Sequence, residues 1–455
     1  MRSRAVSTTT FAREIARDLP EERPYDFFRR LSDASVHRLR RDPSARPGEA
    51  EAALPSRGWR LIRPRVCAPY LAQAVDDFRD YLATAMQVEV TIEAVDDPAA
   101  AAAAGSCIVV GTREQLPGQA GGLRQSKDYA IAVRPECWTV CGYDERGAMH
   151  GLYHLEARLN LREAPYQPRD LAVVRHSLYE TRMALSSLGW MDWPDALLSH
   201  MVHDGFDAIF ASVYANPNGD RTTSDTSNDF YARLLHRVRR QDPARMRDLI
   251  DRAARFGIKV YAPVIYQYTG TPESEAGLRR LVQDLLREFP DIRGYVLLTE
   301  GFWYGTWGGA HGASREYVEN WAREWSRAVA IVAEECHRVN PAIDILPWEY
   351  NIDFRPQNVD MKRYFVQQLP TDCTPLCTWE NGKSFEMDGM KGHLRDYSLN
   401  QVGPAEVTAA QIEEIRRRGM KVFCKADSFA SWQFGTVPYL PFPQQWYERY
   451  QALER

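Results

Sequence analysis

The stretch GYVLLTEGFWYGTWGG, residues 294–309, decides how this chain is interpreted. It begins as an apolar run of strand length, stops on the acid Glu300 and continues into a segment rich in aromatic residues. Two later stretches also run apolar and then stop on an acid close to a Trp or Tyr: AIDILPWEYN (342–351) with Glu349, and DCTPLCTWENG (372–382) with Glu380. Short apolar runs of this kind are typical of strands buried on both faces, so the repetition predicts parallel strands whose ends carry acids and aromatic rings.

From residue 171 to residue 455 the chain alternates strand-like and helix-like segments. Long helices between buried strands favour a TIM-like (β/α) barrel within the α/β class over a sandwich. Seven strands are predicted: RMALSSLGW (182–190), FDAIFASVY (206–214), IKVYAPVIY (258–266), YVLLTE (295–300), IDILPWEY (343–350), TPLCTWE (374–380) and KVFCKADS (421–428). Such a barrel closes with eight strands, and the residues after 428 end in a helix-like segment. We therefore expect a barrel that lacks its closing strand, either because the chain is truncated at its C-terminus or because the barrel itself is incomplete.

Two regions precede the predicted barrel. Residues 58–170 combine four strand-like runs with two amphipathic helical segments, which predicts a small α/β domain. Residues 1–57 contain short charged helical stretches followed by a segment rich in Pro and Ala, which predicts an N-terminal helical arm and linker.

Composition excludes several classes of partner. The 455 residues have a formal net charge of -4, which offers no electrostatic basis for binding nucleic acid or an anionic membrane. No apolar run approaches the roughly 20 residues of a membrane span, and no signal-peptide core is visible at the N-terminus. A cytoplasmic location is expected, and the 8 cysteines are predicted to be buried free thiols, as suits a reducing compartment. The oligomeric state is left open.

Acids beside flat rings at strand ends suit sugar chemistry. Carboxylates handle protons and an oxocarbenium-like charge, while aromatic rings bind the apolar faces of pyranoses. Glu300 is predicted to be the general acid, because an acid at the carboxyl end of a barrel strand lies where the active sites of this fold are found. Glu349 and Glu380 are the candidate partners, each as nucleophile, base or hydroxyl-binding acid, and a structural role for either stays open.

Further residues near strand ends are candidates for binding a sugar. Each has a structural alternative, which is core packing for an aromatic side chain and an ion pair for a charged one. They are Arg182, Trp303, Trp307, Trp348, Trp379, Lys425, Asp427 and Trp432. Lys425 and Asp427 are two apart on one strand, so both can point to the barrel mouth, and Lys425 could hold a substrate carboxylate.

The segment YAIAVRPECWTVCGYDERGAMHGLYHLEARL (129–159) resembles the small α/β domain that precedes the barrel in family 20 β-hexosaminidases and family 67 α-glucuronidases. The resemblance lies in a strand, a G-x-D-x-x-G-x-x-x-G-like turn and a helix. Arg182 matches an arginine that binds sugar hydroxyls in family 20, and Glu300 matches the general acid of both families. Thr299 stands where family 20 enzymes carry an aspartate that orients the acetamido group. The resemblance implies a glycoside hydrolase that cleaves a terminal sugar residue.

Other chemistries have weaker support. His150 and His154, and His200 and His203, lack the acid of an H-E-x-x-H motif, so neither a metal site nor a cofactor is predicted. A carbohydrate-binding protein that has kept the barrel but lost catalysis is the main alternative. A barrel lyase or metal-dependent hydrolase acting on uronic-acid sugars is a third.

Overall fold

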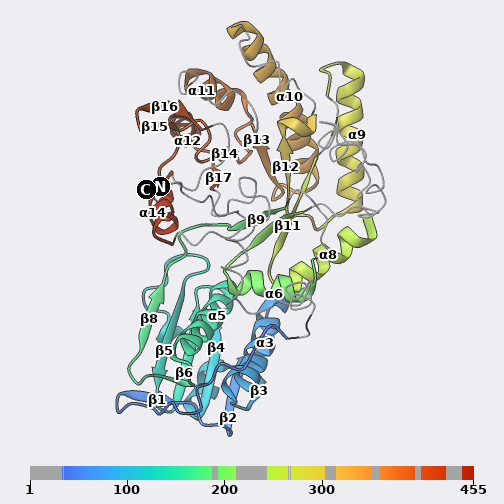
Figure 1. Cartoon of the computed structure of the whole chain (residues 1–455). Helices are drawn as coiled ribbons and strands as arrows, with labels where there is room; N and C mark the ends of the chain where they lie inside the picture. The colour runs from blue at the N-terminus through green and yellow to red at the C-terminus, as the bar shows by residue number, and fades with distance from the viewer. Residues whose placement is uncertain are drawn as a thin grey trace, which may run out of the picture.

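The computed structural model describes residue 33 and residues 35–186, 193–211, 243–264, 266, 268–302, 314–349, 359–394, 401–426 and 443–454. For Leu185, Ser186, Glu300 and Gly301 it describes the backbone alone. The chain builds two α/β units, one on a six-stranded sheet and one on a seven-stranded sheet. In Figure 1 the unit with the six-stranded sheet lies below the other. Within the described part of the chain, no helix is both long and apolar enough to cross a membrane.

The first sheet is mixed, with the strand order β3-β2-β4-β6-β5-β8. Strands β2, β3, β4 and β6 run parallel to one another, whereas β5 is antiparallel to both of its neighbours. The strands are β2 (Trp59–Pro64), β3 (Val90–Val95), β4 (Cys107–Thr112), β5 (Tyr129–Arg134), β6 (Cys137–Gly142) and β8 (Ala172–Arg175). This confirms strands at the four runs that suggested a small α/β domain. Because β8 belongs to this sheet, the first unit extends a few residues beyond 170.

Helices cover both faces of the first sheet. Helices α3 (Pro69–Met86) and α5 (Glu145–Arg162) pack together on one face, and the short α4 (Pro98–Ala103) lies on the other. Helix α3 buries Leu71, Val75, Phe78 and Leu82, whose spacing of three and four residues places them on one side of the helix. The eight cysteines of the chain are all unbridged.

The glycine-rich turn before α5 is tight for steric reasons. Asp144 caps the helix, with its carboxylate accepting a hydrogen bond from Gly147 N at 2.8 Å. A Cβ on Gly147 would lie 2.1 Å from the carbonyl oxygen of Asp128, and one on Gly142 would lie 2.1 Å from Ala148 N. The motif on which the family resemblance rested therefore has a packing function in this chain.

The segment before β2 is packed against the first unit. Strand β1 (Glu51–Ala53) pairs with β7 (Tyr166–Pro168), and Ala52 and Leu54 are buried in the core. Further upstream, the amides of Arg40 and Arg41 donate to Ala85 O at the end of α3. Residues 35–57 thus form part of the first unit, where the sequence suggested a loose arm and linker.

The second sheet contains the seven predicted barrel strands, all parallel and in chain order. Each pairs with the next, from β9 at one edge to β17 at the other. They are β9 (Met183–Ser186), β10 (Ala208–Ala211), β11 (Lys259–Pro263), β12 (Gly294–Leu298), β13 (Asp344–Trp348), β14 (Leu376–Thr378) and β17 (Phe423–Lys425). A short hairpin of β15 (Ser384–Met387) and β16 (Met390–His393) follows β14.

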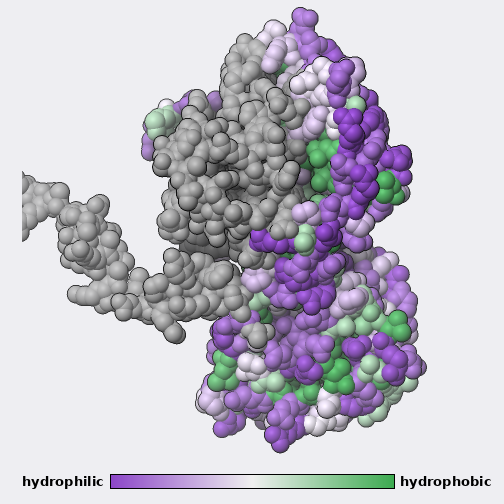
Figure 2. All heavy atoms as spheres, turned by 90° about the vertical axis from the view of Figure 1, so that its right-hand side faces the viewer, coloured by the Kyte–Doolittle hydropathy of each residue, from purple (hydrophilic) through white to green (hydrophobic). Residues whose placement is uncertain are grey.

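Helices connect the strands of this sheet and cover its outer face (Figure 1). They are α6 (Asp195–His203), α8 (Pro243–Arg255), α9 (Pro272–Glu288), α10 (Arg315–Val339), α11 (Val359–Gln368) and α12 (Glu406–Arg417), and a further helix, α14 (Pro443–Glu454), follows the last strand. Ser314 caps α10, its side chain accepting a hydrogen bond from Tyr317 N at 3.2 Å. On the side of α9, the described surface in Figure 2 is mainly hydrophilic, as expected for amphipathic helices that bury one face.

Alternate side chains of the second sheet enter two different cores. Tyr295 and Leu297 of β12 belong to the large core beneath the helices, whereas Val296 and Leu298 belong to a separate cluster on the opposite face. This inner cluster consists of Met183, Ala208, Phe210, Tyr261, Val296, Leu298, Leu346, Trp348, Leu376 and Phe423. It draws on all seven strands, which indicates that the sheet is curled around it.

Two contacts show how far the sheet curls. The rings of Tyr261 on β11 and Phe423 on β17 lie 6.4 Å apart, although three strands separate β11 from β17 in the sheet. Lys421, just before β17, forms a 2.7 Å ion pair with Glu180, just before β9. Among the described residues β9 and β17 are not paired with each other, so the sheet is a curled half-barrel and a closed barrel remains a prediction.

We expect Gly147→Ala to destabilise the protein, because the new methyl group would meet backbone atoms that have no room to move. Overpacking of this kind costs about 1–3 kcal/mol, and a clash with backbone lies at the upper end. Urea denaturation measures the change. Gly118→Ala is the matched control, since nothing lies within 4 Å of its Cβ position. Equal stability of both variants would contradict the packing function of the turn.

Candidate functional site

The alternation of side chains determines which strand-end residues face the inside of the curl. In the register of the sheet, Leu298, Trp348, Leu376 and Phe423 stand level, and all four belong to the inner cluster. Side chains two residues further along a strand lie on the same face, and those one residue further lie on the opposite face. The mouth of the curl is therefore lined by every second residue at these strand ends.

Three residues on the inner face meet at the ends of β13, β14 and β17. Trp348 donates from its ring nitrogen to Thr378 Oγ1 at 3.0 Å, and Lys425 Nζ lies 5.9 Å from the centre of the Trp348 ring. Thr378 and Lys425 are paired in the sheet register. Trp348 is 3% exposed, so its ring is packed within this group. The structure thus brings two predicted sugar-binding residues together with Thr378, for which the sequence predicts no role.

Glu300 lies directly beyond this inner face. It belongs to η2 (Thr299–Phe302), a turn that follows β12 without a break. Leu298, two residues earlier, is paired with Trp348 on β13. The flanking side chains are anchored: Thr299 is fully buried, and the Phe302 ring packs edge-on against Trp325 with ring centres 5.1 Å apart. The backbone of Glu300 is therefore at the carboxyl end of the sheet, and its role as general acid remains a prediction.

Glu349 faces the helices. It follows Trp348 by one residue, which directs its side chain to the opposite face of the sheet. Its carboxylate accepts a 2.7 Å hydrogen bond from Gln411 on α12 and lies 3.6 Å from Lys362 Nζ on α11. Burial raises the pKa of the Glu349 carboxyl, while Lys362 and Gln411 act to lower it. The structure does not bring this carboxylate together with the inner-face group.

Glu380 is buried beside a cation from the last helix. Its Oε1 lies 3.8 Å from a guanidinium nitrogen of Arg449 on α14, and both side chains are almost fully buried. Arg449 also donates to Gln401 O at 2.6 Å. The pair thus links the end of β14 to α14 and to the loop before α12.

Trp379 also holds this loop. Its ring nitrogen donates to Val402 O at 2.9 Å, and its carbonyl accepts from Ala405 N at 2.8 Å. The side chain is 3% exposed. Its neighbour Thr378, one residue earlier, is the residue of this strand that faces inward. Alternation counted back from Glu380 was the signal in the sequence that could have identified Thr378.

Arg182 lies at the other end of the sheet, just before β9, where the two units meet. Its backbone amide donates to Asp207 Oδ2 at 2.9 Å, and its Nε lies 3.7 Å from the same oxygen. Asp207 also binds Lys127 of the first unit at 3.0 Å. Burial acts to raise the pKa of the Asp207 carboxyl, but His150, Lys127 and the amide of Arg182 together lower it. Arg182 is thus separated by the length of a strand from Trp348 and Lys425, which the sequence placed with it as candidates for binding a sugar.

Four candidate sugar-binding residues lie outside the described residues: Trp303, Trp307, Asp427 and Trp432. Their assignments remain predictions. In the described part of the chain one group of His and carboxylate side chains could hold a metal ion, and it lies at the junction of the two units. It is His37, Asp77, Glu156 and His203.

Comparisons with known proteins bear on the fold. A scan against protein-family models and a comparison with curated protein sequences both give no match. Among solved structures, the chain is similar to the glycoside hydrolase family 84 structure CpGH84B, with a TM-score of 0.50 and 10% identity over 84% of this chain. A second such structure, CpGH84D, gives a TM-score of 0.44 and 10% identity over 73% of this chain and 54% of that one.

The chain spans 60% of the length of CpGH84B. The likeness shows a shared α/β fold. It is a likeness to a family 84 structure, whereas the sequence motifs resembled families 20 and 67.

The pH dependence of stability tests the environment of Glu349. A carboxyl whose pKa is raised in the folded state contributes stability that is present below its unfolded pKa and is lost as pH rises through the folded value. Each tenfold difference between the folded and unfolded dissociation constants corresponds to about 1.4 kcal/mol. We therefore expect the unfolding free energy of the wild type to fall, relative to that of Glu349→Gln, as pH rises above the ordinary value of 4.5. Urea titrations at several pH values measure this difference, and parallel pH profiles would contradict it.

The buried contact between Glu380 and Arg449 yields a second prediction. Arg449→Met removes the cation beside Glu380 and the donors to Gln401 O, and breaking a buried ion pair costs about 3–5 kcal/mol. Adding Glu380→Gln should recover part of the loss, because the buried negative charge is removed as well. Chemical denaturation of the single and double variants provides the measurement. Arg280→Met, at an exposed position on α9, is the control and should change stability by less than about 0.5 kcal/mol.

Proposed function

We propose that this protein is a glycoside hydrolase that cleaves a terminal sugar residue by carboxylate acid–base catalysis. The observation that carries the proposal is the position of Glu300 at the end of β12, beside an inner face that ends in Trp348, Thr378 and Lys425. Active sites of sheets curled in this way lie at the carboxyl ends of the strands. The fold likeness to CpGH84B, a glycoside hydrolase family 84 structure, supports the same class of reaction.

In the proposed reaction Glu300 protonates the leaving glycosidic oxygen. Positive charge then develops on the sugar ring, and a second carboxylate stabilises it or activates water. Neither Glu349 nor Glu380 is favoured as this second group, because one lies among the helices and the other beside Arg449. Of the three candidate acids, Glu300 therefore remains in the proposed catalytic site, together with the inner-face residues.

The class of sugar follows from the charge at the mouth. Lys425 offers a cation on the inner face, which suits the carboxylate of a uronic acid. Thr299 has no carboxylate with which to orient an acetamido group. An α-glucuronidase-like specificity is therefore favoured over a hexosaminidase-like one. Comparing turnover of aryl glucuronides and aryl N-acetylhexosaminides distinguishes the two.

We expect Glu300→Gln to lower kcat on a responsive aryl glycoside by about 10²–10⁴-fold, the usual contribution of a general acid. An aryl glycoside with a very acidic leaving group should lose less, because its departure needs little protonation. Full activity of Glu300→Gln on all substrates would refute the assignment. Glu136→Gln, in an exposed turn of the first sheet, controls for the loss of one acid and should leave kcat unchanged.

A second candidate function is sugar binding without catalysis. It is favoured by the placement of Glu349 and Glu380, since neither of these acids joins the inner-face group. Sugar affinity measured by calorimetry, with no turnover of any aryl glycoside, would support this function. Turnover that depends on Glu300 would exclude it.

A further inference from the structure

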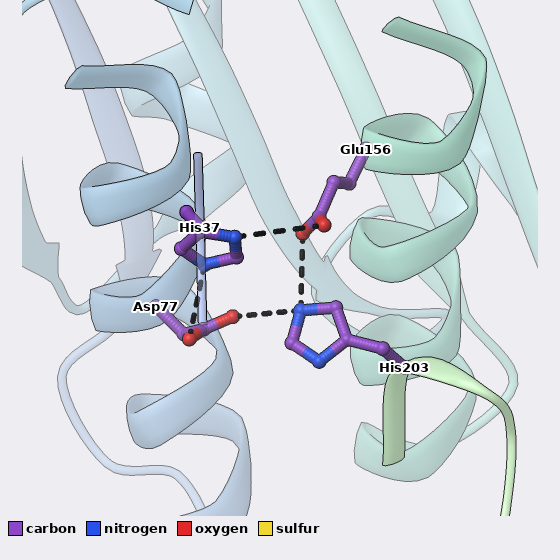
Figure 3. A group of neighbouring side chains, drawn as sticks. All are labelled: His37, Asp77, Glu156 and His203. Atoms are coloured by element: carbon purple, nitrogen blue, oxygen red, sulfur yellow. Dashed lines mark hydrogen bonds and ion pairs between the residues drawn. The ribbon is translucent and has the colours of Figure 1, made fainter. Parts of the chain in front are cut away.

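Four side chains that are distant in sequence converge where the two units meet. Two are imidazoles and two are carboxylates, and they come from the segment before β1, from α3, from α5 and from α6. They are His37, Asp77, Glu156 and His203, and Figure 3 shows all four pointing to a common centre. The group lies near the amino ends of the strands of the second sheet, away from Glu300, because α6 leads directly into β10. Its role is therefore independent of the proposed glycosidase chemistry.

The spacing of the polar atoms suits a small cation. His203 Nε2 lies 3.0 Å from Asp77 Oδ2 and 3.1 Å from Glu156 Oε2. His37 Nε2 lies 3.2 Å from Asp77 Oδ1. One ligand atom from each of the four residues can be chosen so that all lie within 4.8 Å of one another. Donors bound about 2.0–2.2 Å from a tetrahedral ion are separated by roughly 3.3–3.6 Å, so small shifts would place all four around one ion.

The hydrogen bonding of His203 leaves its inner nitrogen facing two acceptors. Its Nδ1 lies 2.7 Å from the carbonyl oxygen of Ser199, an acceptor, so Nδ1 carries a hydrogen. Without an ion Nε2 also carries a proton, because it faces carboxylate oxygens of both Asp77 and Glu156, and a bound cation would take the place of that proton. A proton on Nε2 can bond well to just one of them. Within the described part of the chain Asp77 Oδ2 is buried without a hydrogen bond, although it lies 3.0 Å from that nitrogen.

A divalent cation at the centre of the group could bind His203 Nε2 and both carboxylates at once. Two carboxylates balance its charge, and two neutral imidazoles complete a four-coordinate set of N and O ligands of the kind that binds Zn²⁺. The bond from His203 Nδ1 to Ser199 O is the second contact that commonly orients a metal-binding imidazole. We propose that His37, Asp77, Glu156 and His203 form a binding site for a divalent transition-metal ion, with Zn²⁺ as the ion that fits best.

The surroundings hold the ligands in place. Ser35 Oγ accepts from the amide of His37 at 3.2 Å and donates to Asp80 at 2.6 Å, which ties this segment to α3. The ring of Tyr153 lies 4.2 Å from that of His203 and forms an apolar wall. Burial of this kind shields the ligands from water, so an ion would be held by protein atoms.

Such an ion would connect the two units. His37, Asp77 and Glu156 belong to the first unit, whereas His203 ends α6 of the second. A ligand that binds the folded state alone stabilises it in proportion to the logarithm of its concentration over Kd. The site would therefore act as a clamp between the first sheet and the curled sheet.

Titration of the chelator-treated, full-length protein with Zn²⁺ tests the proposal. We expect one ion per chain by calorimetry, with a rise in Tm as Zn²⁺ is added. Co²⁺ in its place should give the visible absorption of a four-coordinate site with nitrogen and oxygen ligands. Absence of stoichiometric binding in the wild type would overturn the proposal and leave the group as a set of ion pairs.

Variants locate the ion. Asp77→Asn keeps the shape of the side chain, whereas His203→Ala removes the imidazole. As separate variants, each should weaken Zn²⁺ binding by more than about 100-fold and abolish the rise in Tm. The matched controls are Asp76→Asn and His200→Ala, which change exposed neighbours on the same helices and should bind Zn²⁺ as the wild type does. Binding that persists in both ligand variants would place the ion elsewhere and refute the site. The Asp77→Asn result decides the matter if His203→Ala does not fold.

Discussion

Burial of the second sheet on both faces is the constraint on which the structure of the proposed active site depends. Each strand must place alternate side chains into two cores, one beneath the helices and one within the curl. The inner cluster receives side chains from all seven strands of this sheet, and packing them together bends the sheet around them. The same packing brings the carboxyl ends of β12, β13, β14 and β17 side by side, which is where Trp348, Thr378 and Lys425 meet.

This alternation separates residues that look equivalent in the sequence. Glu349 follows the last residue of its strand by one position, which is enough to send its carboxylate to Lys362 and Gln411 among the helices. Glu380 follows its strand by two positions, but the chain has already turned, and its carboxylate lies beside Arg449. Both carboxylates thus contact helices and loops around the mouth, and Glu300 is the acid of the proposed reaction.

Polar side chains hold the two units together. Lys127 of the first unit binds Asp207 at 3.0 Å and donates to the carbonyl oxygens of Tyr179 and Glu180, just before β9. A second polar contact between the units joins His203 to Asp77 and Glu156. Burial alone would lower the pKa of His203, but these two carboxylates raise it to about 10. Buried polar contacts of this kind demand specific geometry, and so they determine how the first unit sits beneath the curled sheet.

The sequence by itself determined the α/β class, most strands of the first sheet and the seven parallel strands of the second, because apolar runs and helical periodicity are local signals. It also indicated Glu300 at the end of a strand. Only the tertiary structure decided the direction of each side chain there, the place of Arg182 at the opposite end of the sheet, and the packing of residues 35–57 on the first unit. The group around His203 could not be predicted because its four members are brought together by contacts between segments as distant as residues 37 and 203. Such contacts arise from the packing of whole helices and sheets, which leaves no periodic trace in the sequence.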